Sequence, residues 1–146
     1  MFLLQLFQKN KVFGEVVDLE VSSRMPFDSV TYRIVRHSDG EIVGECDLRF
    51  GDNEELYYAG NFGYRVFEPF RGNGYAYYAS MLMMAIARDK YHMEKLYVTC
   101  SPENIPSLRT IERLGATLVE PNARVPRYHW LYRRKEYIKN IYILNL

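Results

Sequence analysis

The chain has 146 residues, a formal net charge of +1 at pH 7 and 48% apolar residues. Its length suits one domain, and its composition, which lacks low-complexity runs, predicts a packed globular protein and excludes a disordered one. The near-neutral charge argues against a general nucleic-acid binder, so we expect no nucleic-acid partner. The most apolar stretch, residues 75–87, is too short to cross a bilayer, so we expect a cytoplasmic protein with no membrane partner.

Charge is unevenly spread along the chain. Asp39–Glu55 carries seven acidic residues and one basic residue, whereas Arg124–Lys139 carries six basic residues and one acidic residue. Such runs are usually solvated faces of a protein. The alternative interpretation is that the acidic run forms a rim that attracts a cation.

Four elements are predicted in the first third of the chain. Met1–Phe7 is predicted as a strand rather than a signal peptide, because it lacks a basic start and a small-residue cleavage site. Asn10–Glu20 has apolar residues at mostly helical spacing, which predicts a helix. Thr31–Arg36 and Glu41–Phe50 are predicted as two antiparallel strands, because the Asp-Gly pair between them is typical of a hairpin turn.

The remaining pattern alternates between strands and helices. Leu56–Phe67 is predicted as an aromatic strand, and Tyr75–Asp89 as a helix that is apolar almost all round and therefore buried against the sheet. Asn104 is suited to cap a helix that stops at Gly115. Three short strands complete the pattern: Lys95–Cys100, Thr117–Val119 and Tyr128–Tyr132. This order predicts an α/β domain with a mixed sheet.

The cysteines and histidines do not form a metal-binding pattern. Cys46 and Cys100 lie far apart in apolar alternating runs, so we expect two buried free thiols. His37, His92 and His129 share no ligand spacing. We therefore expect no metal.

The segment Arg71-Gly-Asn-Gly-Tyr-Ala76 lies between a predicted strand and a long apolar helix. Gly72 and Gly74 have no Cβ, so backbone N–H groups can converge on an anion. The helix N-terminus adds a partial positive charge suited to a phosphate. Arg71 can add a charge-assisted bond or brace the loop, and the small Ala76 permits close approach. The alternative is a tight strand-to-helix turn in which the glycines are needed only for the backbone conformation and bind no ligand.

Two sequence motifs carry a resemblance to a known family. No Gly-Lys-Ser/Thr follows the glycines, and their spacing does not fit the dinucleotide fingerprint. Instead, residues 63–76 closely resemble motif A of the GNAT superfamily of N-acetyltransferases, whose core is Arg/Gln-x-x-Gly-x-Gly/Ala. Residues 101–115 resemble motif B, which is Asn-x-x-Ser followed by a helix and Leu-Gly. The likeness is strongest to ribosomal-protein-type N-acetyltransferases and covers residues 39–131 well.

The resemblance implies a fold and a cofactor. The fold would be a single GNAT-like domain over residues 1–146, with a mixed central sheet that is splayed between its fourth and fifth strands and flanked by helices. Acetyl-CoA would lie in that opening, with its pantetheine paired near Val66. Asn104 and Ser107 match positions near the pantetheine and the sulfur. The residues that match the pyrophosphate loop are Arg71, Gly72, Asn73, Gly74, Tyr75 and Ala76.

The chain departs from the family pattern at two catalytic positions. Ile111 stands where many relatives have a general-acid Tyr, and Gly60 stands where some relatives carry a carboxylate. Ser107 or a water must then protonate or stabilise the leaving thiolate. Glu55 or Glu68 is available as a base, directly or through water, although solvated surface carboxylates are the alternative.

The resemblance implies an acyltransferase that moves the acetyl group of acetyl-CoA to a primary amine by direct attack in a ternary complex. The amine would belong to a small molecule or to a peptide or protein N-terminus, and a homodimer is left open. The missing Tyr at position 111 keeps a second hypothesis open, a non-catalytic acyl-CoA-binding regulatory module. A third hypothesis is a phosphate- or nucleotide-binding domain unrelated to acetyl transfer.

Overall fold

The computed structural model describes residues 7, 8 and 10–146, which fold into two compact units. Within these residues, the first unit comprises 7–50, without residue 9, and 62–93, and the second comprises 51–61 and 94–146. The prediction of a single domain over residues 1–146 stays a prediction. None of the helices in these ranges has the length and apolar content that a membrane span requires.

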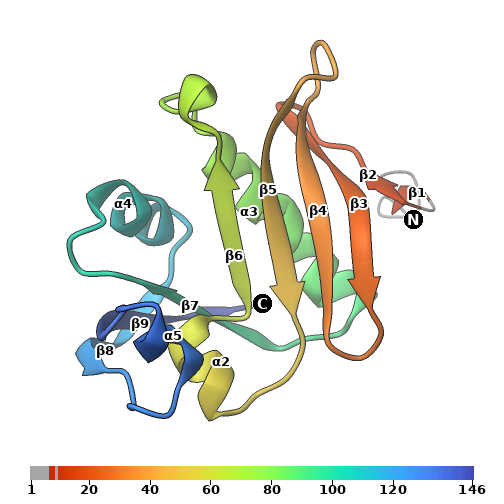
Figure 1. Cartoon of the computed structure of the whole chain (residues 1–146). Coiled ribbons are helices and arrows are strands. Elements are labelled where there is room, and N and C mark those ends of the chain that lie inside the picture. Colours follow the sequence, from red (N-terminus) through yellow and green to blue (C-terminus); the bar gives the residue numbers. More distant parts are fainter. Residues whose placement is uncertain (1–6, 9) are drawn as a thin grey trace. The chain divides into compact units, whose positions relative to one another are not determined.

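The first unit is built on a six-stranded sheet, drawn from red to green-yellow in Figure 1. Its strands are β1 (Phe7–Gln8), β2 (Lys11–Val12), β3 (Val17–Met25), β4 (Ser29–Arg36), β5 (Ile42–Arg49) and β6 (Phe62–Val66). Each strand pairs antiparallel with the next one along the chain. This meander places β6 at one edge of the sheet. The expected first strand, Met1–Phe7, lies outside the described residues except for Phe7.

A single long helix packs on one face of this sheet (Figure 1). The helix α3 (Tyr75–Ala85) continues into a π-helical turn, Ile86–Lys90, so the predicted helix Tyr75–Asp89 is confirmed. Its side chains close to the sheet include Ala79, whose small size lets the two layers approach. The core of this unit contains fully buried side chains from both layers: Leu19, Ile34, Leu48, Met83 and Ile86.

The predicted hairpin between β4 and β5 is confirmed. Gly40 has φ +77°, a left-handed conformation that glycine adopts without a steric penalty. Arg36 closes the turn by donating two hydrogen bonds to the carboxylate of Asp39, from Nε at 2.9 Å and from Nη2 at 2.7 Å. The hairpin tip is thus held by side chains as well as by the backbone.

The predicted helix at Asn10–Glu20 is wrong, because the chain forms β2 and the start of β3 there. Val17, Asp18 and Leu19 are buried one after another, and β3 pairs with β4 along its whole length. The β-branched valines suit this pairing. Tertiary pairing therefore overrode a helical spacing that was only partly regular.

The predicted strand Leu56–Phe67 is also wrong in its first half. Residues 54–59 form the helix α2 (Glu54–Ala59), and only Phe62–Val66 forms a strand. Asn53 caps this helix, with Oδ1 accepting from the N–H of Leu56 at 2.9 Å. Gly60, at φ +88°, ends it. An Asn followed by two glutamates is a helix-start signal, and it outweighs the strand propensity of the aromatic residues.

The second unit has a three-stranded antiparallel sheet in the order β7-β9-β8. The strands are β7 (Lys95–Cys100), β8 (Thr117–Arg124) and β9 (Ile138–Asn145), and the helices are α2, α4 (Ile105–Arg113) and α5 (Trp130–Arg133). Asn104 caps α4 as predicted, and Gly115, at φ +85°, follows its last residues. Fully buried side chains form the core of this unit: Leu96, Ile111, Ile141 and Leu144.

The predicted last strand, Tyr128–Tyr132, is wrong. This segment contains α5, whose cap is His129, and the last strand is Ile138–Asn145. The Nδ1 atom of His129 accepts from the N–H of Leu131 at 3.1 Å, which favours a helical turn. The alternating, β-branched sequence from Ile138 was the stronger strand signal.

The α/β fold class is confirmed, although its strands are divided differently from our expectation. In place of one mixed sheet, the described residues form two sheets, and every ladder in both is antiparallel. β6 and β7 belong to different sheets, in agreement with a break between the fourth and fifth predicted strands. Cys46 and Cys100 are buried free thiols, as predicted.

Candidate functional site

The predicted phosphate loop joins β6 to α3 in the first unit. After a 3-10 turn at Glu68–Phe70, the chain reaches Gly72 at φ +86° and Gly74 at φ +76°. Gly74 is the N-cap of α3 and supplies no side-chain acceptor. The first N–H groups of a helix have no acceptor within the helix, so those of Tyr75 and Ala76 can bind an anion.

The loop leaves space for a ligand. A Cβ added at Gly72 would have no heavy atom within 4 Å, and one added at Gly74 would meet only the ring of Tyr78, at 3.4 Å. Both glycines have backbone conformations that L side chains rarely adopt. An open, amide-lined turn at a helix N-terminus suits an anionic group such as a phosphate.

Side chains of the loop hold it in place. The Nε atom of Arg71 donates to the carbonyl oxygen of Val66 at 3.0 Å, which ties the loop to the end of β6. The Nδ2 atom of Asn73 donates to the carbonyl oxygen of Phe70 at 2.9 Å. Of the two roles considered for Arg71, bracing the loop is thus the one seen in the structure.

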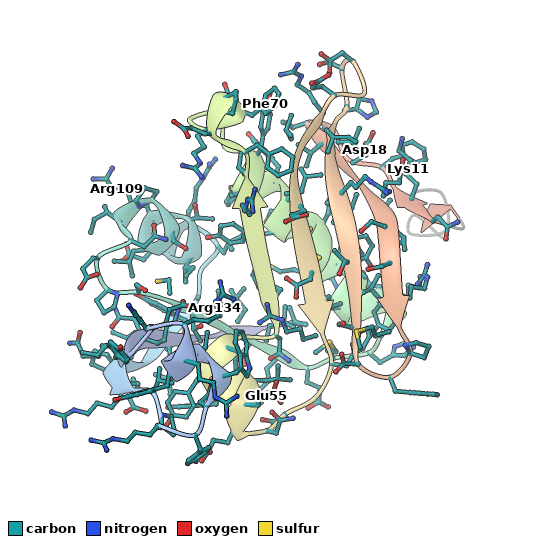
Figure 2. The ribbon with its side chains drawn as sticks, in the orientation of Figure 1. Lys11, Asp18, Glu55, Phe70, Arg109 and Arg134 are labelled. Atoms are coloured by element: carbon teal, nitrogen blue, oxygen red, sulfur yellow. The ribbon has the colours of Figure 1, made fainter. Side chains whose placement is uncertain are left out.

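Arg36 supports the loop from the β4–β5 hairpin, and sequence reasoning missed this residue. Its Nη1 lies 3.5 Å from the hydroxyl of Tyr75, and its guanidinium lies 5.5 Å from the ring centroid of Phe70. Figure 2 shows Phe70 at the same end of the sheet as Asp18. The paired Asp39 raises the pKa of Arg36, and Arg36 holds the pKa of Asp39 at about 2, below its ordinary 3.8. The i, i+3 spacing of Arg36 and Asp39 was the available signal.

The low pKa of Asp39 leads to a prediction about acid stability. Because the pKa of Asp39 is lower in the folded state, its carboxylate stabilises the fold above pH 4, and this stabilisation is lost as the pH falls towards 2. Asp39→Asn should therefore lower the free energy of unfolding at pH 7, with a smaller difference from the wild type near pH 2. Urea denaturation at both pH values measures this effect, and Glu41→Gln, an exposed neighbour in the same turn, is the control. Equal differences at both pH values would contradict it.

β6 is an edge strand of its sheet, so only one of its two sides pairs with β5. The N–H of Phe67 donates to the carbonyl oxygen of Val43 at 2.9 Å, and Val66 stands opposite Gly44. Backbone groups alternate in direction along an antiparallel strand, so the N–H of Val66 points away from β5. It can therefore donate to a group that lies along the edge of this sheet.

The second motif lies on α4 in the second unit. The Oδ1 atom of Asn104 accepts from the N–H of Ser107 at 3.3 Å, so the two predicted residues share the first turn of the helix. Ser107 is half-buried. Ile111, one turn further on, is fully buried and fills the core of this unit. Its apolar side chain is thus explained by packing.

Glu55 projects from α2 and is exposed (Figure 2). Its Oε1 accepts from the indole Nε1 of Trp130 at 3.3 Å. The backbone oxygen of Glu55 accepts from Nε2 of His129 at 2.9 Å, because Nδ1 of that ring is already an acceptor. The neighbouring Glu54 accepts a hydrogen bond from the hydroxyl of Tyr128. Aromatic donors of residues 128–130 therefore fix both carboxylates.

The predicted site residues fall into three groups. Val66 and residues 71–76 are together in the first unit, Asn104 and Ser107 are together on α4, and Glu55 stands on α2 beside α5. In the part of the chain that the structure describes, no three His, Cys, Asp or Glu side chains are placed to hold a metal ion.

Solved structures with a similar fold are acetyltransferases. A GNAT-family acetyltransferase from Bacillus anthracis is 20% identical at a TM-score of 0.60, with 79% of this chain and 65% of that chain covered. The microcin C7 self-immunity acetyltransferase MccE, in complex with acetyl-CoA and AMP, is 20% identical at a TM-score of 0.60, with 82% and 62% covered. The present chain thus spans less than two thirds of these two proteins.

A third structure is matched over nearly its whole length. The ribosomal-protein-S5-alanine acetyltransferase from Vibrio fischeri is 11% identical at a TM-score of 0.68, with 92% of this chain and 96% of that chain covered. No curated protein matches the chain. A family model described as an acetyltransferase (GNAT) domain matches residues 12–117. Since this match covers most of the sequence, and the solved structures share the fold, the chain belongs to the GNAT acetyltransferase family.

Proposed function

We propose that this protein transfers the acetyl group of acetyl-CoA to a primary amine, by direct attack of the amine in a ternary complex. One observation carries the proposal, namely the open turn at Gly72 and Gly74 against the uncapped N-terminus of α3. Such a turn suits a pyrophosphate, and GNAT acetyltransferases use acetyl-CoA. The solved structure of MccE with acetyl-CoA supports the same cosubstrate.

Residues of the first unit would hold the cosubstrate. The N–H groups of Gly72, Asn73, Gly74, Tyr75 and Ala76 would bind the pyrophosphate, while Arg71 braces the loop. The outward N–H of Val66 would donate to the pantetheine or to the carbonyl oxygen that becomes negative during attack. Bound acetyl-CoA supplies the thioester carbon that the amine attacks.

Residues of the second unit would handle the protons. A C–N bond forms and the C–S bond breaks, so one proton leaves the amine and the departing thiolate needs a hydrogen bond or a proton. Ser107 would donate a hydrogen bond to the departing thiolate, because Ser107 matches the second motif and lies in the first turn of α4 beside Asn104. Glu55 would act as the base that accepts the proton of the amine, directly or through water.

The acceptor class follows from charge and from one relative. The acidic run Asp39–Glu55 would attract a protonated amine, which loses its proton before attack. The Vibrio fischeri structure is named as a ribosomal-protein-S5-alanine acetyltransferase. That name supports a protein or peptide N-terminus as the acceptor here, beside small-molecule amines.

A non-catalytic acyl-CoA-binding module is the second candidate, because the fully buried Ile111 occupies the position of the family's Tyr. Release of free CoA thiol, measured with a panel of amines and N-terminal peptides, separates the two. Turnover above the acceptor-free rate supports the enzyme, whereas binding without turnover on any acceptor supports the module. A thermal-shift comparison of acetyl-CoA with ATP and NAD tests whether the site binds CoA at all.

The proposed role of Glu55 predicts a pH-dependent effect. Turnover should rise with pH until the acceptor amine is neutral, and should fall with salt if the acidic run attracts the cation. Glu55→Gln should lower kcat/KM by up to about tenfold below the pKa of the amine and should match the wild type above it. Glu54→Gln, which loses a similarly paired carboxylate on the same helix, is the control. Equal effects of the two substitutions at every pH would remove Glu55 from the mechanism.

A further inference from the structure

One arginine of the β4–β5 hairpin contacts the residues on both sides of the phosphate loop, residues 71–74. The guanidinium of Arg36 lies 5.5 Å from the ring centroid of Phe70, which precedes the loop. Its Nη1 lies 3.5 Å from the hydroxyl of Tyr75, which follows the loop, at the outer limit of a hydrogen bond. Figure 1 shows the tip of this hairpin and the turn after β6 at the same end of the sheet. A single side chain thus joins the two ends of the loop.

Asp39 fixes the direction of this guanidinium. Its carboxylate accepts hydrogen bonds from Nε of Arg36 at 2.9 Å and from Nη2 at 2.7 Å, and such a two-point contact orients the guanidinium plane. The same carboxylate accepts from the backbone N–H of Glu41 at 3.1 Å, so the turn of the hairpin holds the carboxylate in its own place. Arg36 is therefore held in contact with the residues that flank the loop.

The ion pair with Asp39 also determines how Arg36 can act on a ligand. The two side chains together carry no net charge, so the pair attracts a phosphate only weakly. Each guanidinium nitrogen of Arg36 already faces a partner, two of them Asp39 and the third Tyr75. Arg36 is therefore suited to shape the loop, and poorly suited to bind a phosphate directly.

We propose that Arg36 is a positioning residue for acetyl-CoA, which keeps Phe70 and Tyr75 in place so that the amides of residues 72–76 are arranged before the pyrophosphate binds. A loop that is arranged in advance binds more tightly, because less ordering accompanies binding. This inference rests on the proposed function, since it takes the pyrophosphate of acetyl-CoA as the ligand of the loop.

Two substitutions of Arg36 test this role. Arg36→Met should bind acetyl-CoA about five- to tenfold more weakly than the wild type in isothermal titration, because the loop must then be ordered on binding. Arg36→Lys keeps the charge but loses the planar fork that contacts Asp39 at two points, so it should bind nearly as weakly. The matched control is Arg33→Met, which removes a partly exposed, ion-paired cation from the same strand and should bind like the wild type.

Asp39→Asn separates position from charge. This substitution makes the hairpin more positive, but it removes the carboxylate that orients Arg36. We therefore expect about threefold weaker binding of acetyl-CoA. If Arg36 acted as a cation that attracts the phosphates, the same substitution would tighten binding.

Gly40→Val is a further control in the same turn. The N–H of Gly40 donates to the carbonyl oxygen of Arg36 at 2.8 Å, and the N–H of Arg36 donates to the carbonyl oxygen of Glu41 at 2.8 Å. A Cβ at Gly40 would meet no heavy atom within 4 Å. These backbone hydrogen bonds should therefore keep Asp39 and Arg36 in contact, and the affinity for acetyl-CoA should be unchanged.

A measurement on the free protein tests the ordering itself. The N–H of Phe70 donates to the carbonyl oxygen of Phe67 at 2.9 Å, and the N–H of Tyr78 donates to that of Gly74 at 3.1 Å. Hydrogen exchange of these two amides, followed by NMR, should be faster in Arg36→Met than in the wild type. The amides of the β3–β4 ladder should exchange at unchanged rates, because the loss is local.

Four results would overturn the proposal: affinity of Arg36→Met equal to that of Arg33→Met, recovery of affinity in Arg36→Lys, tighter binding by Asp39→Asn, or exchange at Phe70 and Tyr78 that does not change or rises together with that of the whole unit. A wild type that binds no acetyl-CoA would instead contradict the proposed function. The exchange rates of the free protein would still decide whether Arg36 orders the loop.

Discussion

Gly74→Val should weaken acetyl-CoA binding by about ten- to hundredfold, the value of one charge-assisted hydrogen bond from a backbone N–H to a phosphate. Gly74 has φ +76° and begins α3, so a β-branched residue there is strained and turns the first amides of the helix away. Its Cβ would meet only the ring of Tyr78, so the fold should persist. Isothermal titration with acetyl-CoA measures the loss.

Gly40→Val is the control for the strain itself. Gly40 has φ +77°, and a Cβ there meets no heavy atom within 4 Å, so the two substitutions impose nearly the same backbone penalty. Both should lower the free energy of unfolding by about 1–2 kcal/mol. Only the Gly74 variant should lose affinity. Native affinity in a folded Gly74→Val protein would mean that the cosubstrate binds elsewhere.

Ser107→Ala should lower kcat about ten- to hundredfold while the affinity for acetyl-CoA changes little. A hydroxyl is too weak an acid to be a full proton donor at neutral pH, so its role would be a hydrogen bond to the departing thiolate. Loss of a hydrogen bond to a charged group costs about 1.5–3 kcal/mol, which corresponds to that range of rates. Single-turnover kinetics with saturating acetyl-CoA isolates this step.

Thr110→Val is the matched control for the Ser107 variant. Thr110 lies one turn along the same helix, where its hydroxyl donates to the carbonyl oxygen of Pro106 at 3.1 Å, so the change removes a hydroxyl without changing the shape. Its kcat should stay within about twofold of the wild type. If Ser107→Ala behaves like Thr110→Val, water stabilises the thiolate, and Ser107 serves only the start of α4.

The sequence predicted those elements whose signals are local. Tyr75–Asp89 could be recognised because apolar residues surround that helix, and the β4–β5 hairpin because Asp-Gly defines its turn. The failures have a common cause. Asn10–Glu20 has a helical spacing, but the conformation of its second half is set by pairing with β4, more than ten residues further along the chain. Intrinsic propensity cannot register such non-local hydrogen bonds.

The candidate site shows the same division. Gly72 and Gly74 could be assigned from sequence, because a positive φ and an anion-binding turn both require the absence of a Cβ. Two hydrogen bonds of the site could not be predicted from the sequence. The bond of Arg71 to Val66 depends on where β6 ends, and the bond of Arg36 to Tyr75 depends on where the tip of the β4–β5 hairpin lies. The aromatic donors to Glu54 and Glu55 come from residues more than seventy positions away in sequence.

The division of the chain into units has a consequence for synthesis on the ribosome. Residues 51–61 belong to the second unit, yet they are translated between two strands of the first, and β5 and β6 pair across them. The first unit can complete its sheet and helix once residue 93 has emerged. Until β7 and β9 have been synthesised, α2 lacks the strands of its own unit against which it packs. Leu56, which is 5% exposed in the finished protein, then lacks these packing partners. A nascent chain arrested near residue 93 would therefore display this apolar helix to chaperones while the rest of its structure is already protected from proteases.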